Sequence, residues 1–164
     1  MSEKELHQLS IDVGQQLKTQ GLWITCAESC TGGWVAKAIT DIAGSSAWFD
    51  RGFVTYSNAA KHDLLGVSES TLNTFGAVSE EVVREMAQGA LHAAKANLAL
   101  SISGIAGPDG GSIEKPVGTV WFGFADSTGR VLAIKQVFSG DRESVRLQAA
   151  VFSLQTAYNE FLKK

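Results

Sequence analysis

The stretch "WITCAESCTGGWVAKAI", residues 23–39, decides how the rest of the chain can fold. It overlaps "LWITCA", residues 22–27, an apolar run that predicts a buried strand. "TGGWVAKAITDIAG", residues 31–44, has the spacing of apolar residues that is typical of a helix. The small polar residues between them, Glu28 to Gly33, then form a turn from a strand into a helix. Such a unit predicts an α/β fold.

The flanking sequence continues the alternation of helices and strands. A capped helical stripe covers residues 2–21. Further helices are predicted at 58–66, 68–76, 79–96 and 141–162, and further strands at 52–57, 97–104, 117–126 and 131–139. The last two strands are joined by "STGR", most simply as a hairpin. The pattern predicts a mixed sheet with helices on both faces.

Composition limits the functions that need to be considered. The chain has 164 residues and a net charge of −3, which suits one domain over 1–164. No basic run points to nucleic acid. Its apolar runs are far shorter than the ~20 residues of a membrane helix, so we expect no membrane association. The charged N-terminus does not resemble a secretion signal, and we expect a cytoplasmic protein.

The cysteines and histidines do not form a recognisable metal-binding pattern. Cys26 and Cys30 have CxxxC spacing, unlike the CxxC of zinc and redox sites. His7, His62 and His92 form no closely spaced pair. We therefore expect neither a metal nor another cofactor.

Ser29 is placed where ligands collect in α/β proteins, at the carboxyl end of a strand. The N–H groups of the following helix start, at Thr31 and Gly32, are expected to be free to stabilise an anion. That anion could be a phosphate or the oxyanion of acyl transfer. A serine or threonine that only caps the helix explains the same residues almost as well.

A serine nucleophile needs a base, and Lys61 is the preferred candidate. It follows the predicted strand at 52–57, which also brings Tyr56 to a carboxyl end of the sheet. A lysine shielded from water can lose its proton near neutral pH. The alternatives are an ordinary solvated helix lysine, or pairing with Ser57 four residues earlier.

Two further segments are candidates for binding. "SGIAGPDGGSIEKPVG", residues 103–118, is a glycine-rich loop without the GK[ST] ending of a P-loop. Long loops of this kind in compact domains are usually functional. Arg142 and Arg146 come four residues apart at the start of the last helix. We favour a phosphate contact for Arg142 and simple carboxylate pairing for Arg146.

Four segments together resemble the CinA family, in particular its C-terminal amidase domain. They are "AESCTGG" at 27–33, "GSSAWFDRGFVTYSNAAK" at 44–61, "GAVSEEVVREMA" at 76–87 and "SGIAGPDGGSIEKPVGTVWF" at 103–122. The resemblance covers nearly the whole chain. Ala43 and Arg51 depart from the usual family pattern. These departures affect the expected shape of local loops and not the expected chemistry.

The resemblance implies a three-layer α/β/α domain that forms a homodimer and works without a metal. It implies hydrolysis of the carboxamide of nicotinamide mononucleotide to nicotinic acid mononucleotide and ammonia. A non-catalytic relative that binds nucleotides or protein partners is the alternative, and a Cys30 thiolate is the alternative nucleophile.

The site residues implied by the resemblance fall into two groups. Ser29, Tyr56 and Lys61 form the catalytic group, with Lys61 as the base of Ser29. The substrate-binding group comprises Cys30, Thr31, Gly32, Ser46, Ser103, Gly104, Gly107 and Arg142. Within it, backbone N–H groups near Cys30 and Thr31 are expected to bind the oxyanion, and Arg142 with residues 104–107 the phosphate.

Overall fold

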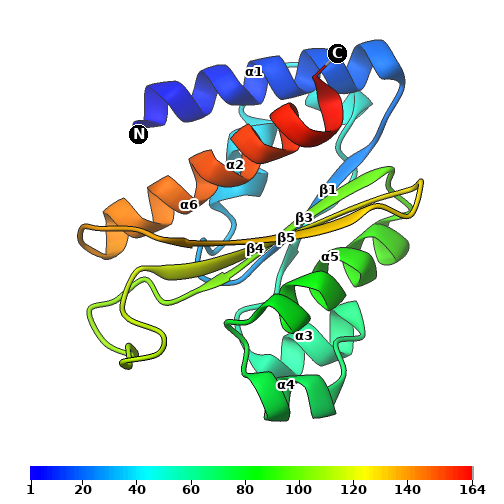
Figure 1. Cartoon of the computed structure of the whole chain (residues 1–164). Coiled ribbons are helices and arrows are strands. Elements are labelled where there is room, and N and C mark those ends of the chain that lie inside the picture. Colours follow the sequence, from blue (N-terminus) through cyan, green and yellow to red (C-terminus); the bar gives the residue numbers. More distant parts are fainter. Residues whose placement is uncertain (164) are drawn as a thin grey trace.

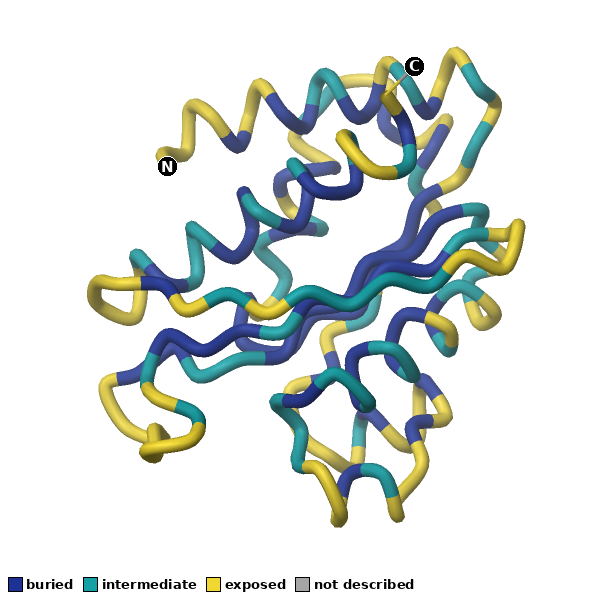
Figure 2. Tube along the Cα trace, viewed as in Figure 1, coloured by how far each residue is buried: buried dark blue, intermediate teal, exposed yellow. Residues whose placement is uncertain are grey.

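The predicted strand–turn–helix lies at the centre of the molecule. In a computed structural model that describes residues 1–163, β1 (Ile24–Glu28) runs parallel to β2 (Phe53–Val54) on one side and to β3 (Leu98–Gly104) on the other. All five residues of β1 are buried. Figure 2 shows this central part of the sheet as its most deeply buried region.

The other two strands complete a mixed sheet. β4 (Thr119–Asp126) runs antiparallel to β3, and β5 (Val131–Val137) antiparallel to β4, which confirms the predicted hairpin. The strand order is β2-β1-β3-β4-β5. Because β1, β2 and β3 are parallel, their carboxyl ends meet at one end of the sheet.

Helices cover both faces of the sheet and give three layers (Figure 1), as the sequence predicts. One side carries α1 (Glu3–Gln20), α2 (Trp34–Thr40) and α6 (Arg142–Ala157), and the other α3 (Asn58–Leu65), α4 (Glu69–Phe75) and α5 (Glu80–Ala94). Two short helical turns, η1 (Ser45–Ala47) and η2 (Tyr158–Leu162), complete the described elements. None of the helices within residues 1–163 is long and apolar enough to cross a bilayer.

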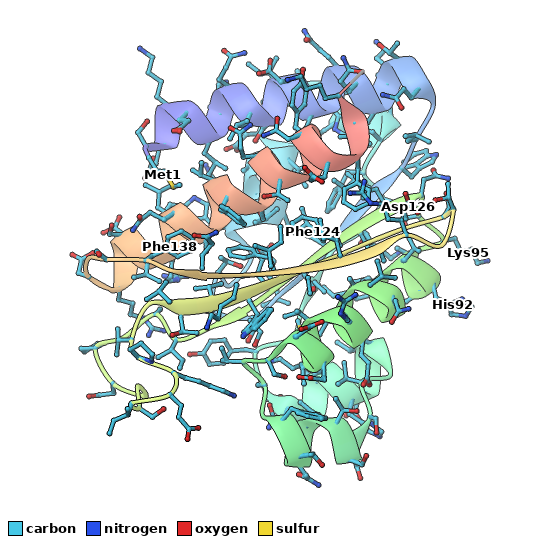
Figure 3. All side chains as sticks on the ribbon, in the orientation of Figure 1. Met1, His92, Lys95, Phe124, Asp126 and Phe138 are labelled. Atoms are coloured by element: carbon cyan, nitrogen blue, oxygen red, sulfur yellow. The ribbon has the colours of Figure 1, made fainter. Side chains whose placement is uncertain are left out.

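The strand side chains alternate between two hydrophobic cores, as the period of two in a strand requires. Leu100 and Ile102 of β3 belong to the core beneath α1, α2 and α6, whereas Ala99 belongs to the core beneath α5. Phe124 of β4 points toward the α6 side (Figure 3) and stacks on Phe161, with ring centroids 5.9 Å apart. Burying this apolar surface is the main favourable term in the stability of the fold.

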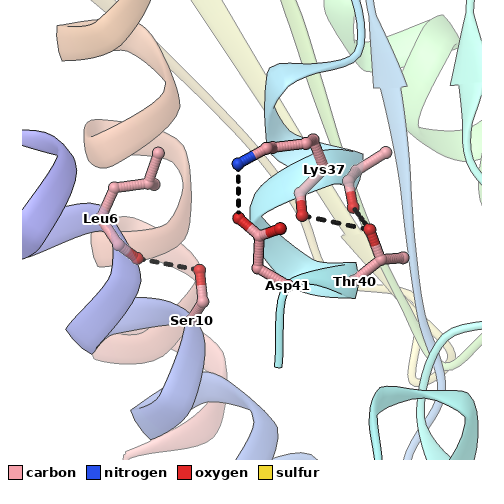
Figure 4. Close-up of polar contacts among 6 residues, drawn as sticks. Leu6, Ser10, Lys37, Thr40 and Asp41 are labelled. Atoms are coloured by element: carbon pink, nitrogen blue, oxygen red, sulfur yellow. Dashed lines mark hydrogen bonds and ion pairs between the residues drawn. The ribbon is translucent and has the colours of Figure 1, made fainter. Parts of the chain in front are cut away.

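Local hydrogen bonds fix the helices around the core. Figure 4 shows Ser10 Oγ donating to the carbonyl of Leu6 within α1, 2.8 Å away. In α2, Lys37 Nζ lies 2.8 Å from a carboxylate oxygen of Asp41. Ser2 caps α1 by accepting from Glu5 N, and Gly21 ends this helix in the left-handed conformation, both as predicted.

Helix α2 begins later than the sequence predicts. We expect it from Thr31, but it begins at Trp34. Gly32 and Gly33 have φ of +61° and +103°, which a right-handed helix cannot contain. The two glycines therefore extend the turn after Ser29 by most of a helical turn.

Gly89 allows α5 to approach the helix that carries Lys61. A Cβ built at Gly89 would lie less than 2 Å from the backbone carbonyl oxygen of Leu65, at the end of α3. The absence of a side chain at Gly89 thus sets the spacing between α3 and α5.

We expect Gly89→Ala to destabilise the protein by about 1–3 kcal/mol, because the new methyl group meets backbone and not a movable side chain. Alanine is otherwise favoured over glycine in helices, so a loss of stability in this variant would come from the packing conflict and not from helix propensity. Urea unfolding measures the loss, with Gln88→Ala on the exposed face of α5 as control. A more stable Gly89→Ala variant would contradict this role for Gly89.

Candidate active site

Ser29 lies at the carboxyl end of β1, as predicted. Its N–H donates to the carbonyl of Ile102 at 3.1 Å, so the residue continues the pairing with β3 by one step. The side chain is 7% exposed, and the neighbouring Gly32 is exposed. Ser29 Oγ is therefore shielded but lies beside a surface from which a small molecule can approach.

Lys61 is the only side chain among the described residues that hydrogen-bonds to the Ser29 hydroxyl, with Nζ 3.0 Å from Oγ. The same Nζ donates to the carbonyls of Thr55 at 2.8 Å and Tyr56 at 3.2 Å. Lys61 is 1% exposed and takes part in none of the ion pairs formed within residues 1–163. Three neutral oxygens surround a buried amine that lacks a counter-charge.

This environment lowers the pKa of Lys61 from 10.5 to about 8, because burial removes water from the charged form. Above pH 8 the amine is mostly neutral, and its lone pair can then accept the proton of the Ser29 hydroxyl. The contact thus pairs a potential nucleophile with a potential base. The alternative of a solvated Lys61 is wrong, as is pairing with Ser57, whose hydroxyl instead accepts from Ala60 N to cap α3.

The start of α2 is not open to a ligand, contrary to our expectation. The Glu28 carboxylate turns back across the loop and accepts from Val35 N and Ala36 N, each at 2.9 Å. Glu28 is fully buried, and these two bonds satisfy its charge. The Glu28 carboxylate therefore occupies the position at the start of α2 where the helix dipole would favour an anionic ligand.

The two predicted oxyanion donors, the N–H groups of Cys30 and Thr31, differ in their access to a ligand, because Cys30 is 5% exposed whereas Thr31 is fully buried. Neither donates to another backbone or side-chain acceptor within residues 1–163, whereas Gly32 N donates to Ser29 O at 3.1 Å. The prediction for Thr31 N–H is therefore wrong for this structure, and the Cys30 N–H, in the turn and not in the helix, is the donor that a ligand can approach. The hydroxyl of Thr31 is buried without a partner, so it does not add a donor on the surface.

Cys30 is poorly suited to act as a thiolate. Burial is the largest of the effects that raise its pKa, to about 11. A cysteine nucleophile at this position would need a lowered pKa, so the direction is opposite to what that alternative requires.

Tyr56, Arg142 and Gly107 come together beside Ser29. The carbonyl of Tyr56 is 3.5 Å from Ser29 Oγ, while its ring is largely exposed. Arg142 Nη1 donates to Gly107 O at 2.8 Å, and Nη2 lies 3.4 Å from the Tyr56 hydroxyl. The guanidinium thus links the glycine-rich loop to the edge of the site.

The structure does not bring Ser46 to the site. Trp48 O accepts from Ile24 N, and Ile24 is at the amino end of β1. In sheet register this end lies beside Leu98 and Asp126, the latter labelled in Figure 3. Ser46 in η1 is therefore at the opposite end of β1 from Ser29, so a single chain does not bring these two residues together.

Ser103 and Gly104 end β3 next to Ser29. Ser103 is 1% exposed, so at most a small part of it can face a ligand. A Cβ at Gly104 would lie 2.6 Å from Val120 Cγ2 and 2.9 Å from Thr119 O. Gly104 is explained by close packing against β4.

Arg146 has a different role from the carboxylate pairing that we expected. Its Nε donates to Cys30 O at 2.9 Å and its Nη2 to Thr31 O at 3.3 Å. The only signal in the sequence is its position four residues after Arg142, which places both on one face of α6.

Comparison with known proteins identifies the family. The family model for the CinA C-terminal domain matches residues 6–161. The chain belongs to the CinA C-terminal domain family. The resemblance of its sequence motifs to this family is therefore confirmed.

Curated and solved relatives of the CinA family cover nearly the whole chain. The nicotinamide-nucleotide amidohydrolase PncC of Enterobacter agglomerans is 77% identical, and that of Escherichia coli K12 is 64% identical, each over 99% of both chains. The crystal structure of competence/damage inducible protein CihA from Agrobacterium tumefaciens superposes with a TM-score of 0.93 at 45% identity, covering 94% of each chain. The α/β fold is thus shared with CinA proteins of known structure.

We expect Lys61→Met to change how stability depends on pH in this CinA domain. Between pH 8 and 10.5 the unfolded chain keeps the Lys61 proton while the folded chain releases it, so Lys61 makes the free energy of unfolding rise with pH. The full contribution is roughly 3 kcal/mol. Lys61→Met lacks this rise. Its free energy of unfolding should therefore exceed that of the wild type by the most below pH 8, and the excess should shrink as the pH rises to 10.5.

Chemical unfolding of both proteins across this pH range measures the difference. Lys37→Met is the control, because the hydrogen bond to Asp41 raises the pKa of Lys37 above its ordinary value, the opposite direction to Lys61. A constant difference between wild type and Lys61→Met would show that Lys61 does not titrate near pH 8.

Proposed function

We propose that this chain hydrolyses the carboxamide of nicotinamide mononucleotide, giving nicotinic acid mononucleotide and ammonia. Ser29 is the nucleophile and Lys61 is its base. The observation that carries the proposal is the buried contact of 3.0 Å between Lys61 Nζ and Ser29 Oγ, made without a counter-charge. The names of the two highly similar relatives, both nicotinamide-nucleotide amidohydrolases, support the choice of substrate.

The first half of the reaction forms an acyl enzyme. Neutral Lys61 takes the proton of the Ser29 hydroxyl as Oγ attacks the carboxamide carbon. The carbonyl oxygen becomes an oxyanion, which the N–H group of Cys30 stabilises. The Lys61 ammonium then gives its proton to the amide nitrogen, the C–N bond breaks, and ammonia leaves.

In the second half of the reaction, the same side chains hydrolyse the acyl enzyme and release the acid product. A water molecule loses a proton to Lys61 and attacks the acyl ester carbon. The oxyanion again forms beside the Cys30 N–H, and the bond to Ser29 Oγ breaks as this oxygen recovers the proton from Lys61. The product is nicotinic acid mononucleotide, and both side chains return to their starting states.

The phosphate of the substrate is assigned to Arg142. Its guanidinium is exposed, is linked to Gly107 and Tyr56, and forms no ion pair with a carboxylate of residues 1–163. An unpaired cation beside the nucleophile can hold the distal anion, and that binding energy positions the carboxamide. The exposed Tyr56 ring lies between Arg142 and the Ser29 turn.

We expect Ser29→Ala to lower ammonia release from nicotinamide mononucleotide by at least about 10³-fold, because no other group supplies the nucleophile. Cys30→Ala should keep most of the activity, since its contribution to the site is through the backbone. Circular dichroism and thermal unfolding verify that both variants fold. An inactive wild-type chain would support the alternative of a non-catalytic relative, and an active Ser29→Ala variant would contradict the nucleophile.

We expect Arg142→Ala to raise KM for the mononucleotide by about tenfold or more, as a charge-assisted contact to phosphate is lost. Nicotinamide riboside lacks the phosphate and should be a poor substrate of the wild type. The variant should therefore discriminate less between nucleotide and riboside. Parallel ammonia-release kinetics on both compounds measure this, and an unchanged preference for the nucleotide would show that Arg142 is not the phosphate ligand.

A further inference from the structure

Arg146 contacts the turn after Ser29 from the side opposite to the free N–H groups. A trans peptide unit is planar, with its C=O and N–H pointing in opposite directions. The carbonyl of Cys30 and the N–H of Thr31 belong to one such unit. Arg146 Nε donates to this carbonyl at 2.9 Å, so the guanidinium is at the carbonyl end of the peptide and the buried Thr31 N–H points away from it.

The guanidinium is held in this position by several contacts. Nη2 donates to the next carbonyl, Thr31 O, at 3.3 Å. The Trp34 ring lies beneath the guanidinium carbon, 5.9 Å from it. A Cβ at Gly32 would be only 3.1 Å from Nη2, so glycine there leaves room for the approach. Arg146 forms none of the ion pairs found among residues 1–163, and its charge is directed at the two carbonyls.

We propose that Arg146 is a positioning residue that holds the Cys30 and Thr31 carbonyls in place, so that Ser29 and the Cys30 N–H keep the orientation that the oxyanion formed on Ser29 requires. The inference rests on the proposed function, because it assigns a partner to that same site. Bonds to two successive carbonyls fix the backbone of the turn, and with it the direction of the Cys30 N–H. Charge-assisted hydrogen bonds are also stronger than neutral ones, which holds the turn rigid.

The two arginines of α6 therefore serve different steps. Arg142 faces Tyr56 and Gly107 at the exposed edge, where it can bind the ground-state substrate. Within residues 1–163 the hydrogen bonds of Arg146 go to the backbone of the turn, beside the Trp34 ring, and its effect is realised where negative charge develops. Loss of Arg142 should alter KM, whereas loss of Arg146 should alter kcat.

The test compares Arg146→Lys, Arg146→Gln and Arg146→Met in ammonia release from nicotinamide mononucleotide. Lysine keeps the charge and N–H donors without the planar guanidinium, glutamine keeps neutral N–H donors, and methionine keeps neither charge nor donor. We expect kcat to fall by about 10–10² in Arg146→Met, within what one oxyanion donor contributes, with KM changed less than about threefold. Arg146→Lys should retain the most activity. Arg84→Met on α5, which removes a guanidinium paired with Glu80, is the matched control and should leave kcat unchanged.

Two further measurements separate this role from a purely structural one. The acid limb of kcat/KM, set by the pKa of Lys61 near 8, should not move in Arg146→Met, since Lys61 owes its lowered pKa to burial. In NMR spectra of the substrate-free protein, the Thr31 amide proton should shift upfield in Arg146→Met and less in Arg146→Lys. This second readout does not depend on turnover.

Several results would overturn the proposal. A raised KM with unchanged kcat would make Arg146 a substrate-binding residue. Equal activity of the lysine, glutamine and methionine variants would exclude a role for its charge, and a displaced acid limb would mean that it acts through Lys61. A wild-type chain that releases no ammonia would remove the proposed function as well, whereas an active wild type with an unaffected Arg146→Met variant would remove only this inference.

Discussion

The hydrogen bond between the buried Lys61 amine and the Ser29 hydroxyl is the constraint on which the rest of the site depends. Burying an amine without a counter-charge costs free energy, and that cost lowers its pKa to about 8. The carbonyls of Thr55 and Tyr56 offset part of it by accepting from Nζ. The packing of α3 on α5 at Gly89 then keeps the amine beneath the carboxyl end of β1.

A second requirement is to hold the Ser29 turn in one shape from both sides. Glu28 does so from the interior, by bonding two N–H groups of α2. Arg146 does so from the other side, by bonding two carbonyls of the turn. Each charged side chain satisfies backbone groups of the turn or of α2, and the N–H groups of Cys30 and Thr31 are left free of internal partners within residues 1–163. A turn held in this way keeps the Cys30 N–H preorganised, as the proposed stabilisation of an oxyanion requires.

Much of the fold follows from local sequence patterns. Apolar periodicity predicts the helices, and the "STGR" turn predicts the β4–β5 hairpin. The pairing of Ser29 with Lys61 is also predictable, because both follow strands whose carboxyl ends meet. The beginning of α2 is not, since periodicity does not show that Gly32 and Gly33 take positive φ.

The contacts that sequence patterns miss are those between distant segments. In the sequence, Glu28 is one of several polar residues in a predicted turn. Only the folded loop brings its carboxylate to the N–H groups of Val35 and Ala36. Ser46 falls within a family motif, yet the bond from Ile24 to Trp48 places it at the other end of β1. Arg146 is separated from Cys30 by 116 residues, and its spacing from Arg142 does not show which of the two faces the turn.

The most direct test of the central claim is the pKa of Lys61 itself. Lysine labelled with ¹³C at Cε gives an NMR signal that shifts as the amine loses its proton, and Lys61→Met identifies the signal of Lys61. The structure leads us to expect a midpoint near pH 8 in the wild-type protein. A midpoint near the ordinary value of 10.5 would mean that Lys61 stays charged at the working pH, and would contradict its role as the base of Ser29.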